Sequence, residues 1–65
     1  MKFNPSRLGL ARKRRGLLQA ALADATGLSL RSLGYYDSGD VEPSEEAAQS
    51  LAEALRFPVE FFYGP

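Results

Sequence analysis

Apolar residues recur along this chain at intervals of three and four positions, the spacing that places side chains on one face of an α-helix. The clearest run is Ala47, Ala48, Leu51, Ala52 and Leu55, and shorter runs are Leu8 with Ala11, Leu22 with Ala23, and Leu33 with Tyr36. No segment of useful length alternates apolar and polar residues as a half-buried strand does. The pattern therefore predicts an all-α fold.

Capping and turn residues between these runs predict where the helices begin and end. Asn4 and Pro5 open a helix over about residues 5–15, because Asn caps a helix and Pro is tolerated in its first turn. A short second helix over residues 18–25 ends at Gly27, a typical C-terminal cap. The same signals predict three more helices, which begin after Ser29, after Ser44 and at Pro58.

Composition limits what such a domain can do. The chain has 65 residues, with no cysteine and no histidine. This length suits one domain, over residues 1–65, and the missing residue types remove disulfides, thiolate zinc sites and the commonest neutral-pH base. We expect no metal, no cofactor and no enzymatic activity. We see no signal peptide and no apolar run long enough for a membrane span, so we expect a soluble, cytoplasmic protein.

Charge is distributed unevenly although the formal net charge is zero. Up to residue 35 the chain carries Lys2, Arg7, Arg12, Lys13, Arg14, Arg15 and Arg31 against Asp24, which is seven minus one, or +6. Beyond residue 35 it carries Arg56 against Asp37, Asp40, Glu42, Glu45, Glu46, Glu53 and Glu60, which is one minus seven, or −6. The basic half fits a nucleic-acid footprint, and both halves also fit solvated helix faces.

A longer pattern joins the second and third predicted helices: Gln19-x-x-Leu22-Ala23-x-x-x-Gly27-Leu28-Ser29-x-x-x-Leu33-x-x-Tyr36-Asp37-x-Gly39. Ala23 is small where two helices cross, Gly27 supplies the tight turn, and the apolar positions fill the space between the helices. With the flanking RLGLARKRRGL and EPSEEAAQSLAEAL, this chain resembles the lambda-repressor-like (XRE, or Cro/cI-type) helix-turn-helix domains over nearly its whole length.

The resemblance implies a compact bundle of five short helices, in which helices 2 and 3 form the helix-turn-helix and helix 3 enters the major groove. It implies that Gln19 contacts a phosphate and braces helix 3. The residues that it places at or near base edges and phosphates are Ser29, Leu30, Arg31, Ser32, Tyr35 and Ser38. Arg31 is suited to guanine and Leu30 to a thymine methyl group. The alternatives are a solvated cation for Arg31, a partly packed surface aromatic for Tyr35, and a purely capping role for Ser29.

The resemblance also implies a structural ion pair between Arg12 and Asp37, which would tie the first helix to the third. Asp is one methylene shorter than the Glu that the family usually has at this position. We therefore expect the bridge to be strained or mediated by water.

Three features depart from the family pattern. Leu18 stands where a capping Ser, Thr or Asn is usual, and Gly34 interrupts helix 3. Asp40 and Val41 occupy a loop that normally carries basic residues, which meet the DNA backbone. Since phosphate contacts dominate affinity for DNA, the acidic loop keeps a second interpretation open beside DNA binding. In it, the chain is a protein-interaction module that keeps the helix-turn-helix fold.

Four aromatic residues crowd the last nine positions: Phe57, Phe61, Phe62 and Tyr63. We expect Phe61 or Phe62 in the core and the others in a dimer or interdomain contact. The first interpretation is then a transcriptional regulator or repressor that binds a near-palindromic double-stranded DNA operator as a homodimer. The domain could also be the N-terminal module of a longer protein, with a further domain or protein partner at its C-terminal side.

Overall fold

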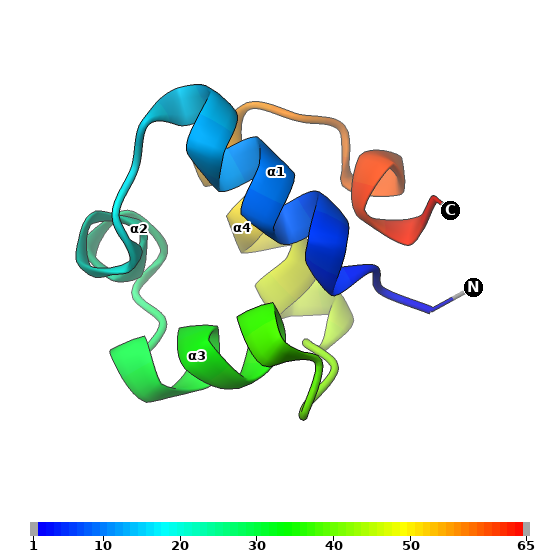
Figure 1. The fold of residues 1–65 in the computed structure, drawn as a ribbon, viewed down its shortest axis with the longest axis horizontal. Helices are drawn as coiled ribbons and strands as arrows, with labels where there is room; N and C mark the ends of the chain where they lie inside the picture. The colour runs from blue at the N-terminus through cyan, green and yellow to red at the C-terminus, as the bar shows by residue number, and fades with distance from the viewer. Residues whose placement is uncertain (1, 65) are drawn as a thin grey trace.

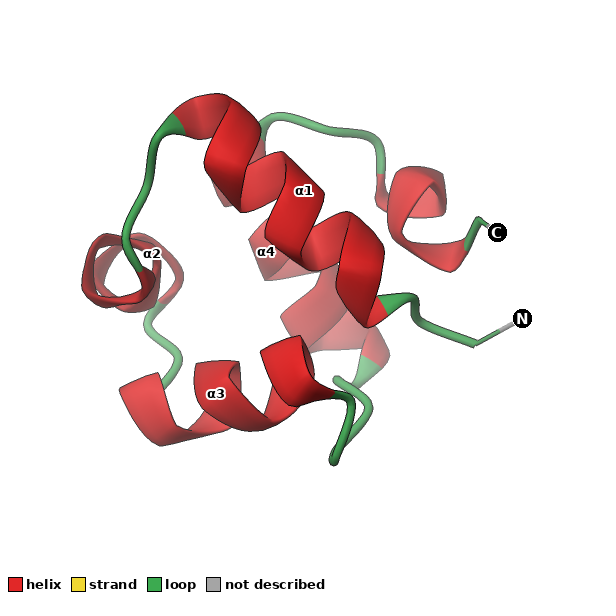
Figure 2. Ribbon diagram, in the orientation of Figure 1, coloured by secondary structure: helices red, strands yellow, loops and turns green. Residues whose placement is uncertain are grey.

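The computed structural model describes residues 2–64, which form four α-helices and one 3₁₀-helix and contain no strand (Figures 1 and 2). The elements are α1 (Pro5–Arg15), α2 (Gln19–Thr26), α3 (Leu30–Ser38), α4 (Glu45–Leu55) and η1 (Val59–Tyr63). The all-α prediction is confirmed. The fifth predicted helix is a single 3₁₀ segment, and α2 begins one residue later than predicted because Leu18 is its N-cap.

Side-chain caps start three of the four α-helices. Asn4 accepts a hydrogen bond from the Ser6 amide, Ser29 from the Ser32 amide and Ser44 from the Ala47 amide. Leu18 gives α2 no such cap within the described chain. Between α2 and α3, Gly27 adopts a φ of 76°, a left-handed conformation that strains most other residues. These local signals set the length of each helix and the turn between α2 and α3.

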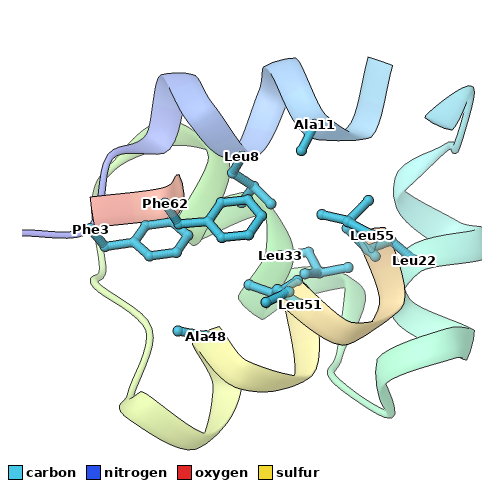
Figure 3. Packing of buried hydrophobic residues seen from close by; sticks show 10 residues of the cluster. Phe3, Leu8, Ala11, Leu22, Leu33, Ala48, Leu51, Leu55 and Phe62 are labelled. Carbon is cyan, nitrogen blue, oxygen red and sulfur yellow. The ribbon is translucent and has the colours of Figure 1, made fainter. Parts of the chain in front are cut away.

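The core draws one or more large side chains from every helix (Figure 3). Its largest members, each less than 2% exposed, are Leu8, Leu22, Leu33, Leu51, Leu55 and Phe62. Phe3 also belongs to it, although it precedes α1 and no periodic pattern indicated it. Its ring stacks on that of Phe62 at a centroid distance of 5.8 Å. The hydrophobic effect of burying these faces together holds the helices in place.

The C-terminal aromatics pack against their own domain. Phe62 is fully buried. This confirms the expectation that Phe61 or Phe62 is a core residue, and it removes Phe62 from the candidates for a dimer or interdomain contact. Phe57 and Phe61 stack on each other at 4.6 Å, and Tyr63 meets Phe3 edge to face at 5.7 Å. Because Phe3 and η1 close over the core together, these rings find partners that the sequence pattern did not reveal. Phe57, Phe61 and Tyr63 remain partly exposed.

The two ends of the described chain lie side by side, as Figure 1 shows. The Asn4 amide donates to the Phe62 carbonyl at 2.6 Å, and Asn4 Nδ2 donates to the Gly64 carbonyl at 2.9 Å. α3 packs against α1 and α2 at the opposite side of the view from η1. This arrangement leaves the outer side of α3 at the edge of the bundle.

Candidate nucleic-acid interface

The outer face of α3 is the part of the helix-turn-helix that can meet a partner. Leu33 is 1% exposed and points into the core, whereas Leu30 is 52% and Tyr35 41% exposed. Arg31 is also exposed and makes no hydrogen bond or ion pair with any residue from 2 to 64. Helical spacing places Leu30, Arg31, Gly34 and Ser38 on one face, with Tyr35 at its margin. This face presents the apolar Leu30 and the ring of Tyr35, together with a guanidinium that has no partner among residues 2–64.

The serines of α3 are occupied by local hydrogen bonds. Ser29 Oγ accepts from the Ser32 amide at 3.0 Å and lies 2.9 Å from Ser32 Oγ. Ser38 Oγ lies 3.1 Å from the Tyr35 carbonyl and 3.0 Å from Asp40 Oδ2. These contacts supply a capping role for Ser29 and a turn role for Ser38. Contacts of Ser29, Ser32 and Ser38 with DNA stay predictions.

A network centred on Asp37 joins the first three helices. Arg12 Nη2 of α1 lies 3.6 Å from Asp37 Oδ2 of α3, and Gln19 Nε2, at the start of α2, donates to the same oxygen at 2.5 Å. Arg12 Nη1 also donates to the Leu17 carbonyl at 3.1 Å. The short Asp37 side chain thus has Gln19 as its nearer partner and Arg12 as its farther one. Gln19 thereby holds the first turn of α2 against the last turn of α3.

Several of the basic residues in the first half of the chain are used inside the domain. Arg15 Nε donates to the Leu55 carbonyl at 2.6 Å and its Nη2 to the Arg56 carbonyl at 2.9 Å, at the C-terminal end of α4. Its guanidinium also lies over the Phe57 ring, 4.6 Å from the centroid. Arg7 lies over the Phe61 ring in the same way, also at 4.6 Å. Together with Arg12, these residues reduce the number of cations that can neutralise phosphate.

Exposed cations and exposed acids flank the helix-turn-helix on different segments. Lys13 and Arg14 are exposed in the last turn of α1, whereas Asp40 and Glu42 are exposed in the loop between α3 and α4. The exposed positive charge around the helix-turn-helix therefore lies on the end of α1 and on Arg31, and the exposed negative charge lies on the loop after α3.

A hollow of about 680 Å³ is lined by residues of α4, η1 and the loop before α4, and by none of α3. Glu42, Glu45 and Glu60 stand along this hollow. Between Lys2 and Gly64 no group of acidic residues is arranged to hold a metal ion. The same residues include no helix long and apolar enough to cross a bilayer.

Taken together, a glycine turn, a short braced helix and an exposed following helix define a helix-turn-helix protein. A family model described as helix-turn-helix matches residues 8–62 of the chain. The chain belongs to this family of XRE, or lambda-repressor-like, domains, a family of DNA-binding regulators. A search of curated proteins found no match.

Proposed function

We propose that this domain binds double-stranded DNA in a sequence-specific manner and acts as a bacterial or phage transcriptional regulator, with α3 in the major groove. The observation that carries the proposal is the outer face of α3, where Arg31 is exposed and unpaired among the described residues. A guanidinium in this position can donate two hydrogen bonds to O6 and N7 of guanine. The match to the helix-turn-helix family supports a DNA-binding regulator in general. The recognition of particular bases is proposed from the exposed residues of α3.

The other contacts follow from the geometry of α2 and α3. Leu30, at the first turn of α3, is suited to a thymine methyl group, and Tyr35 lies five residues further along the helix. The side-chain amide of Gln19 already donates one hydrogen bond to Asp37. To bind a phosphate it must either break this bond or use its second N–H. Since the amide nitrogen has two donors, the second can be offered to DNA while the first stays on Asp37.

We further propose that the bound form is a homodimer on a near-palindromic operator, because one short recognition helix reads only a few base pairs. The partly exposed rings of Phe57, Phe61 and Tyr63 are the proposed surface for a second copy or for a further domain. The domain would act as a repressor in the cytoplasm, either alone or as the N-terminal module of a longer protein.

One specific observation favours a second candidate function. Asp40, Val41 and Glu42 are all exposed in the loop that follows α3, where a DNA backbone would approach. Like charge at this place opposes phosphate, and Arg7, Arg12 and Arg15 are engaged elsewhere. A protein-interaction module that keeps the fold fits these facts as well.

The two functions differ in a selection experiment. The domain would be mixed with random duplexes at about 50 mM salt, the bound fraction sequenced, and the affinity of the enriched site measured again at about 200 mM. The DNA-binding proposal expects an enriched near-palindrome, with a moderate loss of affinity at the higher salt because few cations face outward. Absence of binding at the lower salt would favour the protein-interaction module.

A further inference from the structure

Gly34 lies inside α3, where glycine destabilises a helix relative to alanine. The fold itself gives no reason for it. Gly34 does not have the positive φ that the turn glycines Gly16, Gly27 and Gly39 have. A Cβ atom built at Gly34 would meet no atom within 4 Å among the described residues outside its own helix backbone and chain neighbours. The absence of a side chain here therefore affects the outside of the domain rather than its packing.

The position of Gly34 on α3 suggests what that outside effect is. It follows Leu30 by four residues and Arg31 by three, so it lies between them on the helix face, and Ser38 follows one turn later. Leu30 is exposed and apolar, and Arg31 is exposed and unpaired. Gly34 thus forms a shallow notch in the middle of the face that carries the candidate readout residues.

This inference rests on the proposed DNA-binding function: we propose that Gly34 is the point where α3 approaches the floor of the major groove most closely, and that a thymine methyl group occupies the notch. Thymine is the standard base that displays an apolar group in that groove. A methyl group against the backbone of Gly34 and the side chain of Leu30 is buried on apolar surface. The missing side chain lets the whole helix sit deeper than alanine at the same position would allow.

A deeper seat compensates for weak anchoring to phosphate. Arg7, Arg12 and Arg15 bind within the domain, and the exposed Asp40 would oppose a phosphate, so a larger share of the binding energy would come from contacts with base edges. Close approach at Gly34 increases those contacts without adding any charge.

The test combines a protein change with a base change. Wild type and Gly34→Ala would be titrated with the selected operator and with the same operator carrying deoxyuridine in place of single thymines, which removes only the methyl group. At one thymine of each half-site we expect wild type to lose about fourfold in affinity, the value of one buried methyl-sized group. Gly34→Ala should lose about tenfold on the thymine operator, comparable to the loss of one base contact, and less on the uracil operator.

Gly9→Ala is the matched control. Gly9 also lies inside an α-helix, and a Cβ atom there also meets nothing within 4 Å. Both substitutions should raise the melting temperature, because alanine is the better helix former. Only Gly34→Ala should weaken DNA binding, and its raised melting temperature would show that the domain is folded.

Three outcomes would overturn the inference, and they are distinguishable. If wild type binds no duplex, the DNA-binding function and the notch both fail. If wild type binds an operator and Gly34→Ala binds it equally well, the notch fails and the DNA-binding function stands. If Gly34→Ala loses the same factor on the thymine and uracil operators, the methyl group is not the occupant.

Discussion

Asp37 shares one carboxylate oxygen between Gln19 and Arg12, at 2.5 Å and 3.6 Å respectively. The glutamine, rather than the arginine, is the close partner. Its hydrogen bond compensates for the short reach of an aspartate at a position where the family usually has glutamate. This hydrogen bond holds the start of α2 against the end of α3, and it thereby fixes the orientation of the outer face of α3 relative to α2.

Removal of this carboxylate should loosen the domain. Asp37→Ala leaves the partly buried Arg12 and Gln19 without their shared acceptor, so we expect the free energy of unfolding to fall by about 1–3 kcal/mol. Urea unfolding followed by circular dichroism measures this change. Asp24→Ala, at an exposed carboxylate of α2, is the control and should have little effect. Equal stability of the two variants would contradict a structural role for the network.

Addition of a missing cap should stabilise the domain. Leu18 precedes α2, is 74% exposed and gives no side-chain hydrogen bond to the described part of the helix, so Leu18→Ser adds an acceptor at little loss of packing. We expect a gain of about 1 kcal/mol in the free energy of unfolding.

Leu10→Ser is the matched control for this gain. Leu10 is 43% exposed but lies inside α1, where a serine caps nothing. Calorimetric melting of both variants should show a higher melting temperature for Leu18→Ser alone. If the melting temperature rises in neither variant, the free amides of the first turn of α2 do not gain from a side-chain cap.

The neighbouring residues Arg14 and Arg15 should differ in their effect on stability. Arg15 donates to two carbonyls at the end of α4 and covers Phe57, whereas Arg14 is exposed and has no partner among residues 2–64. Arg15→Ala should therefore reduce the free energy of unfolding by about 1–2 kcal/mol. Arg14→Ala should leave it unchanged while weakening binding to all DNA sequences alike. The opposite order of the two unfolding free energies would refute this assignment.

Sequence preference should depend on Arg31. Arg31→Ala removes the proposed guanine contact, so we expect discrimination at one position of each half-site to fall by about 1–3 kcal/mol, with no change in melting temperature. Repeating the selection with this variant shows which position is relaxed. A preference profile identical to that of wild type would remove Arg31 from the set of reading residues.

The helices and the turn could be predicted because their causes are local. The side chains of Asn4, Ser29 and Ser44 each cap an amide no more than three residues away, and Gly27 forms the turn through its own left-handed backbone conformation. The buried residues of α4 follow the helical period closely. The outer position of Arg31 followed from the same periodicity.

The remaining features depend on contacts between distant segments. Arg14 and Arg15 are adjacent and identical in the sequence. They differ only because Arg15 donates hydrogen bonds to the end of α4, about forty residues later in the chain. Phe3 lies outside any helix, so no period marks it as a core residue. Phe62 rather than Phe61 is the buried ring because η1 packs with Phe62 stacked on Phe3, a contact between the two ends of the chain.

The contact between the two ends of the chain has a kinetic consequence. The Asn4 side chain donates a hydrogen bond to the Gly64 carbonyl across a separation of 60 residues, and the Asn4 backbone amide donates to the Phe62 carbonyl. A loop of this length has an entropic cost of closure, whereas α2 and α3 meet within a few residues. The ends are therefore expected to join late in folding and to open first, as one unit. In hydrogen exchange, the amide of Asn4 should lose protection before that of Leu33, so the helix-turn-helix outlasts the closure of the ends.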